Sequence, residues 1–314
     1  MKRFLPCLLV LAVGCSSSEK SGDGSAGEQA KKRGDELALQ GDLAGAEAEF
    51  TAAIAADGNY AAAWNNRGNV YLRQGQVDRA ISDFDRAAAI VPSDARPLAN
   101  RGWAWYLKKD LVKARADLDG ALKIDPKHHA ALYRRGRVLW AAGDLVGAER
   151  DLAACAQGSP GDADALASLG EVRIRLLRFD DATQAVDAAL KANPKHPAAL
   201  NARGVVAHHK GNHAKAIADY TAAIAADPSD PMYWYNRGIC QLDEKRNKEA
   251  IADFDEAIRL NPKNPSSWKL RGFAKFTDGQ GDLCLPDYRE ALRIAPANWP
   301  DRKEIEEWLA KDKK

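Results

Sequence analysis

A glycine recurs every 34 residues through most of this 314-residue chain, without a single insertion or deletion. Alanine, or in one repeat cysteine, keeps the same phase 12 and 19 residues after the glycine, and proline follows 24 residues after all but the first. A fixed period of this length is typical of one supersecondary unit stacked on copies of itself. The eight glycines that carry the phase are Gly34, Gly68, Gly102, Gly136, Gly170, Gly204, Gly238 and Gly272.

These columns predict two helices joined by a short turn in each 34-residue unit. The small residues allow helices to cross closely, and the proline ends the second helix because it cannot continue the backbone hydrogen-bond ladder. Bulky residues stand four positions before and sixteen after the glycine, as Trp64 and Phe84 do around Gly68. Bulky residues packed against small ones form a continuous core, although no single repeat could fold alone.

One repeat carries most of the pattern of a known family, in the residues Trp64, Gly68, Tyr71, Gly75, Ala80, Phe84, Ala87 and Pro92. With this pattern the chain resembles a tetratricopeptide repeat protein over residues 27–298. The resemblance implies an all-α, right-handed superhelical solenoid of eight helix-turn-helix repeats, whose first helices line the inner wall. The expected repeats are 27–60, 61–94, 95–128, 129–162, 163–196, 197–230, 231–264 and 265–298, followed by a capping helix at 299–314.

An arginine precedes the glycine in seven repeats, and an acidic residue follows the glycine by fifteen positions in the same seven. The fifth repeat has Leu169 and Ala185 at these two places. Because both charges are lost together within one repeat, we expect the two side chains to touch across the helix hairpin. The predicted ion pairs are Arg33–Glu49, Arg67–Asp83, Arg101–Asp117, Arg135–Asp151, Arg203–Asp219, Arg237–Asp253 and Arg271–Asp287.

The start of the chain has the composition of an export signal. Lys2 and Arg3 precede a short apolar stretch over residues 4–13, which ends in small residues. A basic end, a short apolar middle and a small residue at the cut are typical of a secretory signal rather than of a membrane-spanning helix. We therefore predict a signal peptide over residues 1–14.

A cysteine follows that segment directly. The sequence around Cys15 resembles the lipobox of bacterial lipoproteins, which implies that Cys15 is lipidated and begins the mature chain. Ordinary secretion, with Cys15 downstream of the cut, is the alternative. Residues 15–26 then form a flexible polar linker. By the same resemblance, Ser16 after the cysteine favours the outer membrane, facing the periplasm, with the lipid as the only membrane attachment.

Composition argues against several classes of function. The 46 Lys and Arg residues nearly balance the 44 Asp and Glu residues, so the basic footprint of a nucleic-acid-binding protein is missing. The sequence shows no nucleophile–base constellation, phosphate loop or metal cluster, so we expect no enzyme, no cofactor and no small-molecule substrate. Cys155, Cys240 and Cys284 stand at small positions and are expected to be buried. His209 and His213 are four residues apart but lack a third metal ligand.

The first helices carry side chains that the core does not need. Their aromatic rings offer large contact areas, and their amides can pair with both edges of a peptide backbone, so they suit an extended polypeptide. The alternative is that the amides merely solvate the wall. By resemblance to peptide-binding members, Asn66, Asn100 and Asn236 occupy the column that grips a peptide backbone. The candidate groove consists of Asn65, Asn66, Asn69, Arg73, Asn100, Trp103, Tyr106, Tyr133, Arg134, Arg137, Trp140, Asn201, Tyr235, Asn236 and Phe273.

The sequence therefore predicts a non-enzymatic scaffold or adaptor, tethered in the bacterial cell envelope, that binds extended segments of partner proteins in a concave groove. By analogy with lipoproteins that contain such repeats, we expect a role in assembling an envelope complex. Two alternatives remain at this stage. One is self-assembly through the open ends of the solenoid, and the other is an enzyme-associated or metal-binding subunit that uses the histidine group.

Overall fold

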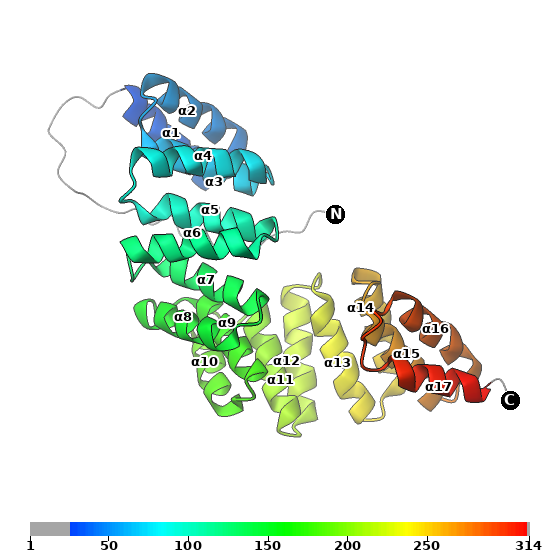
Figure 1. Ribbon diagram of the computed structural model, residues 1–314. Coiled ribbons are helices and arrows are strands. Elements are labelled where there is room, and N and C mark those ends of the chain that lie inside the picture. Colours follow the sequence, from blue (N-terminus) through cyan, green and yellow to red (C-terminus); the bar gives the residue numbers. More distant parts are fainter. Residues whose placement is uncertain (1–25, 313–314) are drawn as a thin grey trace. The chain divides into compact units, whose positions relative to one another are not determined.

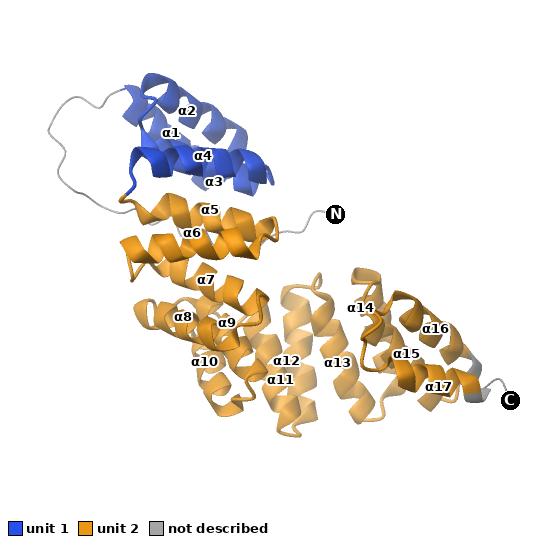
Figure 2. Ribbon diagram, in the orientation of Figure 1, with its two compact units in different colours: residues 1–92 blue, residues 93–314 orange. Residues whose placement is uncertain are grey.

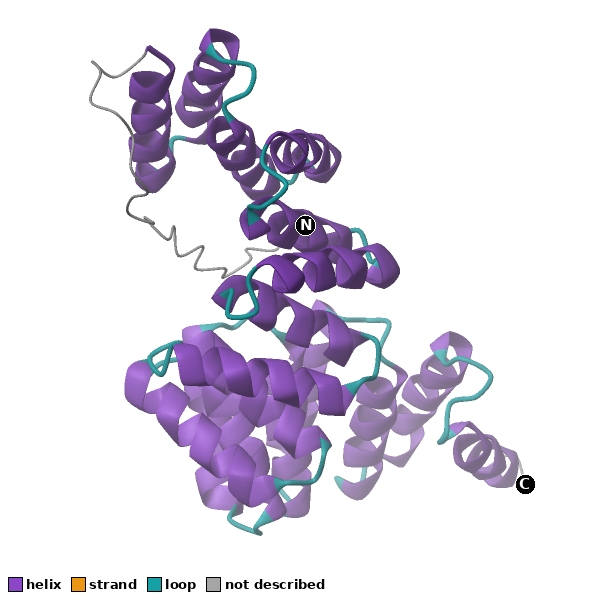
Figure 3. Ribbon diagram, turned by 60° about the vertical axis from the view of Figure 1, so that its left-hand side comes forward, coloured by secondary structure: helices purple, strands orange, loops and turns teal. Residues whose placement is uncertain are grey.

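The computed structural model describes residues 26–312, in which all regular structure is helical: seventeen α-helices and one short 3₁₀-helix, with no strand (Figure 3). The all-α prediction is therefore confirmed. The predicted signal peptide, Cys15 and all but the last residue of the linker lie outside the described residues. None of the described helices is both long and apolar enough to cross a membrane.

Sixteen of the helices form eight successive hairpins in phase with the glycine repeat (Figure 1). The first helices are α1 (Ala26–Gln40), α3 (Ala61–Arg73), α5 (Ala95–Leu107), α7 (His129–Ala141), α9 (Ala163–Arg175), α11 (Pro197–His209), α13 (Pro231–Asp243) and α15 (Pro265–Thr277). The second helices are α2 (Leu43–Ala56), α4 (Val77–Ile90), α6 (Leu111–Ile124), α8 (Leu145–Gly158), α10 (Phe179–Ala192), α12 (His213–Ala226), α14 (Asn247–Leu260) and α16 (Leu285–Ile294), the last preceded by η1 (Gly281–Cys284).

The chain divides into two compact units, residues 1–92 and residues 93–314 (Figure 2). The described part of unit 1 holds the first two repeats. Unit 2 holds the other six repeats and a last helix, α17 (Arg302–Asp312). Within each unit the two helices of a repeat pack along each other, and the second helix contacts the first helix of the next repeat.

In unit 2 the first helices form the inner side of the stack. Each of them from α5 to α13 contacts the first helix of the next repeat, whereas second helices of successive repeats do not contact one another. Because successive first helices lie closer together than successive second helices, the row of hairpins curves toward the first helices. The expectation that first helices line the inner wall is thus confirmed for unit 2, and we call this surface the inner face.

The periodic glycine marks the closest contact within a hairpin. A Cβ atom on Gly238 would lie 2.8 Å from the ring of Phe254, sixteen residues later, and the side chain at that position crowds the glycine in every other repeat too. Phe254 is completely buried. The glycine is therefore required by the ring that packs on it, as the bulky and small columns predicted.

Two local rules end the helices. The residue seven after the periodic glycine has a positive φ in every repeat, which lets the chain reverse between helices; it is glycine in five repeats and Lys109, Leu177 or Lys245 in the others. The second helices end two residues before the column proline, as α6 does ahead of Asp125 and Pro126. The residue before a proline is disfavoured in helical conformation, which explains this stop.

The last helix covers the apolar end of the eighth repeat. It begins at Arg302, three residues later than expected, because Pro300 follows Trp299 and the chain turns there. Its Ile305 is buried in a cluster with Cys284 of η1 and with Tyr288 and Ala291 of α16, and Trp299 and Trp308 pack around them. The helix thus shields a surface that a further repeat would otherwise cover.

All seven predicted arginine–acid pairs are present within their repeats, with N···O distances of 2.5 to 2.9 Å. In six of them the guanidinium uses Nε and Nη2 to bind both carboxylate oxygens. In the fifth repeat, Leu169 and Ala185 are both buried instead. The inference from their joint replacement is confirmed.

Candidate functional site

The fifteen predicted groove residues divide between the two units. Asn65, Asn66, Asn69 and Arg73 belong to unit 1, and the other eleven lie on first helices of unit 2. Each set is therefore described within its own unit.

In unit 1 the predicted residues join the two first helices. Asn66 Nδ2 donates to Asp35 Oδ1 at 2.8 Å, and Arg73 Nη1 donates to the carbonyl of Ala38 at 2.6 Å. Asn65 and Asn69 are both buried. Asn66 and Arg73 therefore serve the contact between the first and second repeats.

The aromatic residues of α5 stack on each other. The ring centroids of Trp103 and Tyr106 are 4.8 Å apart and the planes nearly parallel. Trp103 is only 7% exposed, and Tyr106 covers one face of its ring. The expected exposed indole is therefore largely buried, and Tyr106 provides more of the accessible surface of this repeat.

The basic residues of α7 are fixed in position by their neighbours. Arg137 Nη1 donates to the Tyr133 hydroxyl at 3.0 Å, and its guanidinium lies 5.9 Å from the Tyr133 ring and 5.7 Å from the Trp140 ring. Cations over aromatic faces at this distance are attracted by the ring quadrupole. Arg134 is buried and donates to Asn100 Oδ1 at 2.6 Å. The α7 surface therefore presents a preorganised cation among aromatic rings.

Glu171 is a residue of the inner face that the sequence reasoning missed. It follows Gly170 directly and so stands in the same column as Arg137 of the preceding repeat. The side chain is partly exposed, but loss of water around its carboxyl group on α9 raises the pKa of Glu171 to about 7. The positive charge of Arg137 favours the ionised carboxylate and opposes this rise. The sequence signal that could have revealed Glu171 is its position directly after the periodic glycine, where Arg137 stands in the preceding repeat.

The asparagines near the other end of unit 2 pair with each other. Asn236 Nδ2 donates to Asn201 Oδ1 at 2.9 Å, which links α13 to α11. The contact between Arg134 and Asn100 links α7 to α5 in the same way. Part of the hydrogen-bonding capacity of these inner-face side chains therefore connects successive repeats.

Among the first helices of unit 2, the exposed large apolar side chains lie on the last two, α13 and α15. Phe273 and Phe276 of α15 are 46% and 48% exposed, and Met232 at the start of α13 is 42% exposed. Tyr235 is partly buried and meets the Phe254 ring edge-on. Phe276 also meets the Trp308 ring of α17 edge-on, with centroids 5.5 Å apart, yet about half of Phe273 and of Phe276 stays open as apolar contact area.

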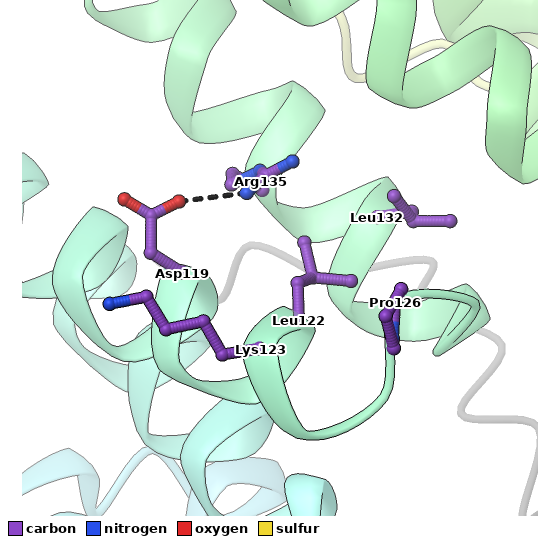
Figure 4. Close-up of a pocket in the computed structure, with 6 residues that line it drawn as sticks. All are labelled: Asp119, Leu122, Lys123, Pro126, Leu132 and Arg135. Atoms are coloured by element: carbon purple, nitrogen blue, oxygen red, sulfur yellow. Dashed lines mark hydrogen bonds and ion pairs between the residues drawn. The ribbon is translucent and has the colours of Figure 1, made fainter.

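A pocket of about 320 Å³ lies between α6 and α7, on a surface that none of the predicted groove residues line (Figure 4). Leu122, Leu132 and Pro126 form its apolar part. Asp119 and Arg135 flank it and form an ion pair at 2.8 Å. Its lining residues come from the third and fourth repeats, so the pocket lies at the junction between these two repeats.

His129, Cys155 and Asp162 have the residue types of a nucleophilic triad but not its chemistry. His129 Nε2 lies 2.8 Å from Asp162, and Cys155 Sγ is nearly equidistant from the two ring nitrogens, at 3.4 and 3.5 Å. Cys155 is completely buried, which raises the pKa of its thiol to about 12. Since the thiolate is the reactive form, this cysteine is inert at neutral pH. Cys240 and Cys284 are also fully buried, as expected.

A family profile described as the tetratricopeptide repeat matches residues 31–95, 110–163, 167–231 and 211–265, which together exceed half of the chain. The chain belongs to the tetratricopeptide repeat family. Arrays of this family are scaffolds typical of protein–protein interaction. The sequence has no match among the curated proteins.

Solved structures of tetratricopeptide repeat proteins share the fold at low identity. The APC/C hetero-tetramer Cut9–Hcn1 is similar with a TM-score of 0.72 and 16% identity, covering 88% of this chain and 55% of that chain, so the match spans about half of that relative. A tetratricopeptide repeat protein from Parabacteroides merdae has a TM-score of 0.59 and 20% identity over 80% of this chain and 99% of that one. PilW, a type IV pilus biogenesis factor, has a TM-score of 0.59 and 21% identity over 66% and 96%.

Proposed function

We propose that the chain is a non-enzymatic adaptor that binds extended segments of partner proteins along the inner face of unit 2. The observation that carries this proposal is the continuous row of first helices from α5 to α15, which brings aromatic, charged and apolar side chains to one side. Phe273 and Phe276 on that row keep about half of their surface exposed, although Phe276 also packs against Trp308 of α17. Exposed apolar groups of this kind mark interaction sites.

The column one position after the glycine suggests what the partner segment looks like. Through unit 2 it reads Trp103, Arg137, Glu171, Val205, Ile239 and Phe273. Neighbouring helices lie about 8–10 Å apart, which an extended chain covers in about three residues. A complementary segment would therefore present an acidic residue to α7, a basic residue about three positions away to α9, and apolar residues beyond. Such charge complementarity would set the register of binding.

We further propose that a lipid on Cys15 tethers this adaptor in the bacterial envelope, with the scaffold facing the periplasm. Support comes from the basic and apolar start of the sequence and the cysteine that follows it. PilW shares the fold and is a pilus biogenesis factor. A comparable role in assembling an envelope complex is the specific function that we infer for this chain.

Site-specific photo-crosslinking in cells tests the inner-face proposal. A photoreactive residue in place of Tyr106 or Phe273 should capture the same partner chain, because both stand on the inner face. The matched control is Arg259 on α14, a second helix, where the side chain is 63% exposed. Equal capture from Arg259, or no common partner from the two inner positions, would overturn the proposal.

A variant experiment separates binding from folding. Arg137→Ala combined with Phe273→Ala should abolish capture from Tyr106 while the far-ultraviolet circular dichroism stays that of the parent. These positions are preferable to Asn100 and Arg134, which support each other's packing. Concentration-dependent sedimentation of the purified chain would instead favour self-assembly.

The lipid is tested independently. Metabolic labelling with an alkyne fatty acid should mark the chain, and Cys15→Ser should lose the label and leave the membrane fraction. Retained label in that variant would reject lipidation at Cys15 while leaving the inner-face proposal unaffected.

A further inference from the structure

Two histidines and an aspartate meet where the sixth repeat contacts the seventh. His208 lies near the end of α11, His213 is the first residue of α12, and Asp243 is the last residue of α13. One nitrogen or oxygen atom from each lies within 4.8 Å of the others. His208 Nε2 is 2.6 Å from Asp243 Oδ2, and the two imidazole rings are 5.3 Å apart and edge-on.

This arrangement differs from the sequence expectation in two respects. The sequence pairs His209 with His213, but the ring of His209 stacks flat on Phe179 with centroids 3.6 Å apart. His208 takes the place beside His213 instead. The sequence also shows no third ligand, whereas the structure brings Asp243 from the next repeat, thirty residues after His213 in the chain.

A comparison among the repeats shows that the two histidines replace an apolar pair. The position four after the glycine is apolar or aromatic in all seven other repeats, and only the sixth repeat has histidine there, at His208. The position nine after the glycine is apolar in the first five repeats, and only the sixth has histidine there, at His213. In the third and fourth repeats these two positions pack in one hydrophobic cluster, as Tyr106 with Leu111 and Trp140 with Leu145. Two positions that share one hydrophobic cluster in other repeats have therefore both changed to imidazole in the sixth.

We propose that His208, His213 and Asp243 form a binding site for a divalent transition ion of the Zn²⁺ type. Imidazole nitrogen and carboxylate oxygen are the ligands that Zn²⁺ takes from His and Asp, and three protein ligands leave a fourth position for water. Glu244 Oε1 lies 2.6 Å from His213 Nδ1. A carboxylate on one ring nitrogen orients the imidazole so that the other nitrogen, Nε2, binds the ion.

The ion would take the place of a direct contact. With metal–ligand bonds of about 2.0–2.2 Å, two ligand atoms of a tetrahedral ion stand about 3.3–3.6 Å apart. His208 and Asp243 are closer than this, and the remaining atoms are no farther than 4.8 Å. Rotation of the His208 and Asp243 side chains is therefore the adjustment that binding needs, because both are at helix ends and partly exposed.

The backbone around the site is firmly held. The thiol of Cys240 donates to the carbonyl of His213 at 3.5 Å, and Cys240 is buried with Ala207, Ala216 and Tyr220. The three ligand side chains remain between 24% and 46% exposed. The site is thus accessible from solvent, built on a rigid scaffold, and placed so that an ion would join α11, α12 and α13.

Metal binding by an untagged full chain tests the proposal. Equilibrium dialysis with Zn²⁺ should give one ion per chain, and titration with Co²⁺ should produce visible d–d absorption that Zn²⁺ abolishes. His208→Ala, His213→Ala and Asp243→Asn should each weaken Zn²⁺ binding by at least about tenfold. Asp243→Asn is the sharpest of the three, because the amide keeps the shape and removes the anionic ligand.

Two variants serve as matched controls. His209→Ala removes the adjacent imidazole that stacks on Phe179, and Cys155→Ala dismantles the other cluster of possible ligands, at His129 and Asp162. Both should bind Zn²⁺ like the parent, and circular dichroism should show the same helix content for all five variants. The proposal is overturned if the parent chain retains no stoichiometric Zn²⁺, if the three ligand variants bind as well as the parent, or if Cys155→Ala abolishes binding.

Discussion

Arg67 grips Asp83 across the hairpin of the second repeat: its Nε and Nη2 donate to the two carboxylate oxygens at 2.8 and 3.0 Å. Its remaining nitrogen, Nη1, donates to Thr51 of the preceding repeat at 3.1 Å. The same arginine column therefore joins the helices of one repeat and also joins that repeat to its predecessor. Equivalent contacts between repeats are Arg135–Asp119, Arg237–Thr221 and Arg271–Asp255.

The aspartates in most of these arginine–acid pairs are buried, so each buried aspartate needs its arginine to compensate its charge. Desolvation raises the pKa of Asp83 and of Asp253 above the ordinary aspartate value, and the hydrogen bonds from Arg67 and Arg237 oppose that shift. A buried carboxylate left without its arginine is costly, whereas replacing both partners with apolar residues is often tolerated. The fifth repeat, with Leu169 and Ala185, is a natural example of the second case.

The sixth repeat offers a direct test. Arg203 binds Asp219 through Nε and Nη2 at 2.9 and 2.6 Å. Arg203→Leu should destabilise the chain by about 3–5 kcal/mol, because it strands a buried carboxylate. Adding Asp219→Ala, which reproduces the residues of the fifth repeat, should recover most of that loss. Urea unfolding of the single and double variants measures both effects, and a double variant no more stable than Arg203→Leu would contradict the account.

The third repeat contains two helical glycines with opposite expected responses to alanine. A Cβ on Gly102 would lie 2.8 Å from Leu118 Cγ and 3.0 Å from the carbonyl of Ala114, so Gly102→Ala should destabilise by about 1–3 kcal/mol. A Cβ on Gly120 would make only an ordinary contact, 3.4 Å from Leu98. Gly120→Ala should therefore stabilise by up to about 1 kcal/mol through helix propensity. Thermal unfolding midpoints should move in opposite directions, and a shared direction would count against the packing argument.

Leu177 occupies a turn position where five other repeats have glycine. Its φ is +59° and its side chain is 75% exposed, so it bears a left-handed backbone conformation with little packing in return. That conformation costs a non-glycine residue about 1–2 kcal/mol. Leu177→Gly relieves this cost, but glycine gains conformational entropy in the unfolded chain, which offsets part of the benefit. The net effect should be a higher unfolding midpoint, equivalent to about 0.5–1 kcal/mol of added stability.

The reverse substitution at an equivalent turn provides the control. Gly143 has a φ of +86° and open space around the position of a Cβ atom. Gly143→Leu should therefore lower the midpoint, and the loss would come from the backbone alone. If Leu177→Gly and Gly143→Leu shifted stability in the same direction, backbone strain would not be the cause.

Periodicity made the fold and its internal contacts predictable. The Gly68 column with the bulky Phe84 column gave the closest helix contact, and the joint loss of charge at Leu169 and Ala185 gave the seven ion pairs. These features recur in each repeat, so eight independent copies reveal which residues depend on each other. The positive-φ turn was also encoded, in the five glycines at the Gly143 position, although three repeats hide it behind lysine or leucine.

Features confined to one repeat were harder to predict. Periodicity placed Trp103 on the inner face but could not show that it stacks on Tyr106 and becomes largely buried. The histidine beside His213 is His208, because the adjacent His209 ring stacks on Phe179 instead. Asp243 joins them only through the packing of successive repeats. Side-chain direction and contacts between repeats, not helix boundaries, were the missing information.

The pKa of Glu171 links the inner face to pH. Burial raises this pKa from 4.5 to about 7, so between these values the folded chain holds a proton that the unfolded chain has lost. Stability contributed by the protonated form is therefore present below about pH 4.5 and is lost as pH rises toward 7. Glu171→Gln mimics that form at every pH. The variant should match the parent near pH 4 and exceed its stability at pH 8 by about 1 kcal/mol or more, since one pKa unit corresponds to about 1.4 kcal/mol.

Glu249 gives the opposite sign and so serves as the control. A hydrogen bond from its own backbone amide and another from Arg246 lower its pKa, so its stabilising effect is present at neutral pH and is lost on acidification. Glu249→Gln should therefore be less stable than the parent at pH 8, with the difference closing at low pH. Urea midpoints measured across this range for both variants distinguish the two cases. If the difference between Glu171→Gln and the parent did not change with pH, Glu171 would have an ordinary pKa, and the inner face around Arg137 would be more open to water than its packing indicates.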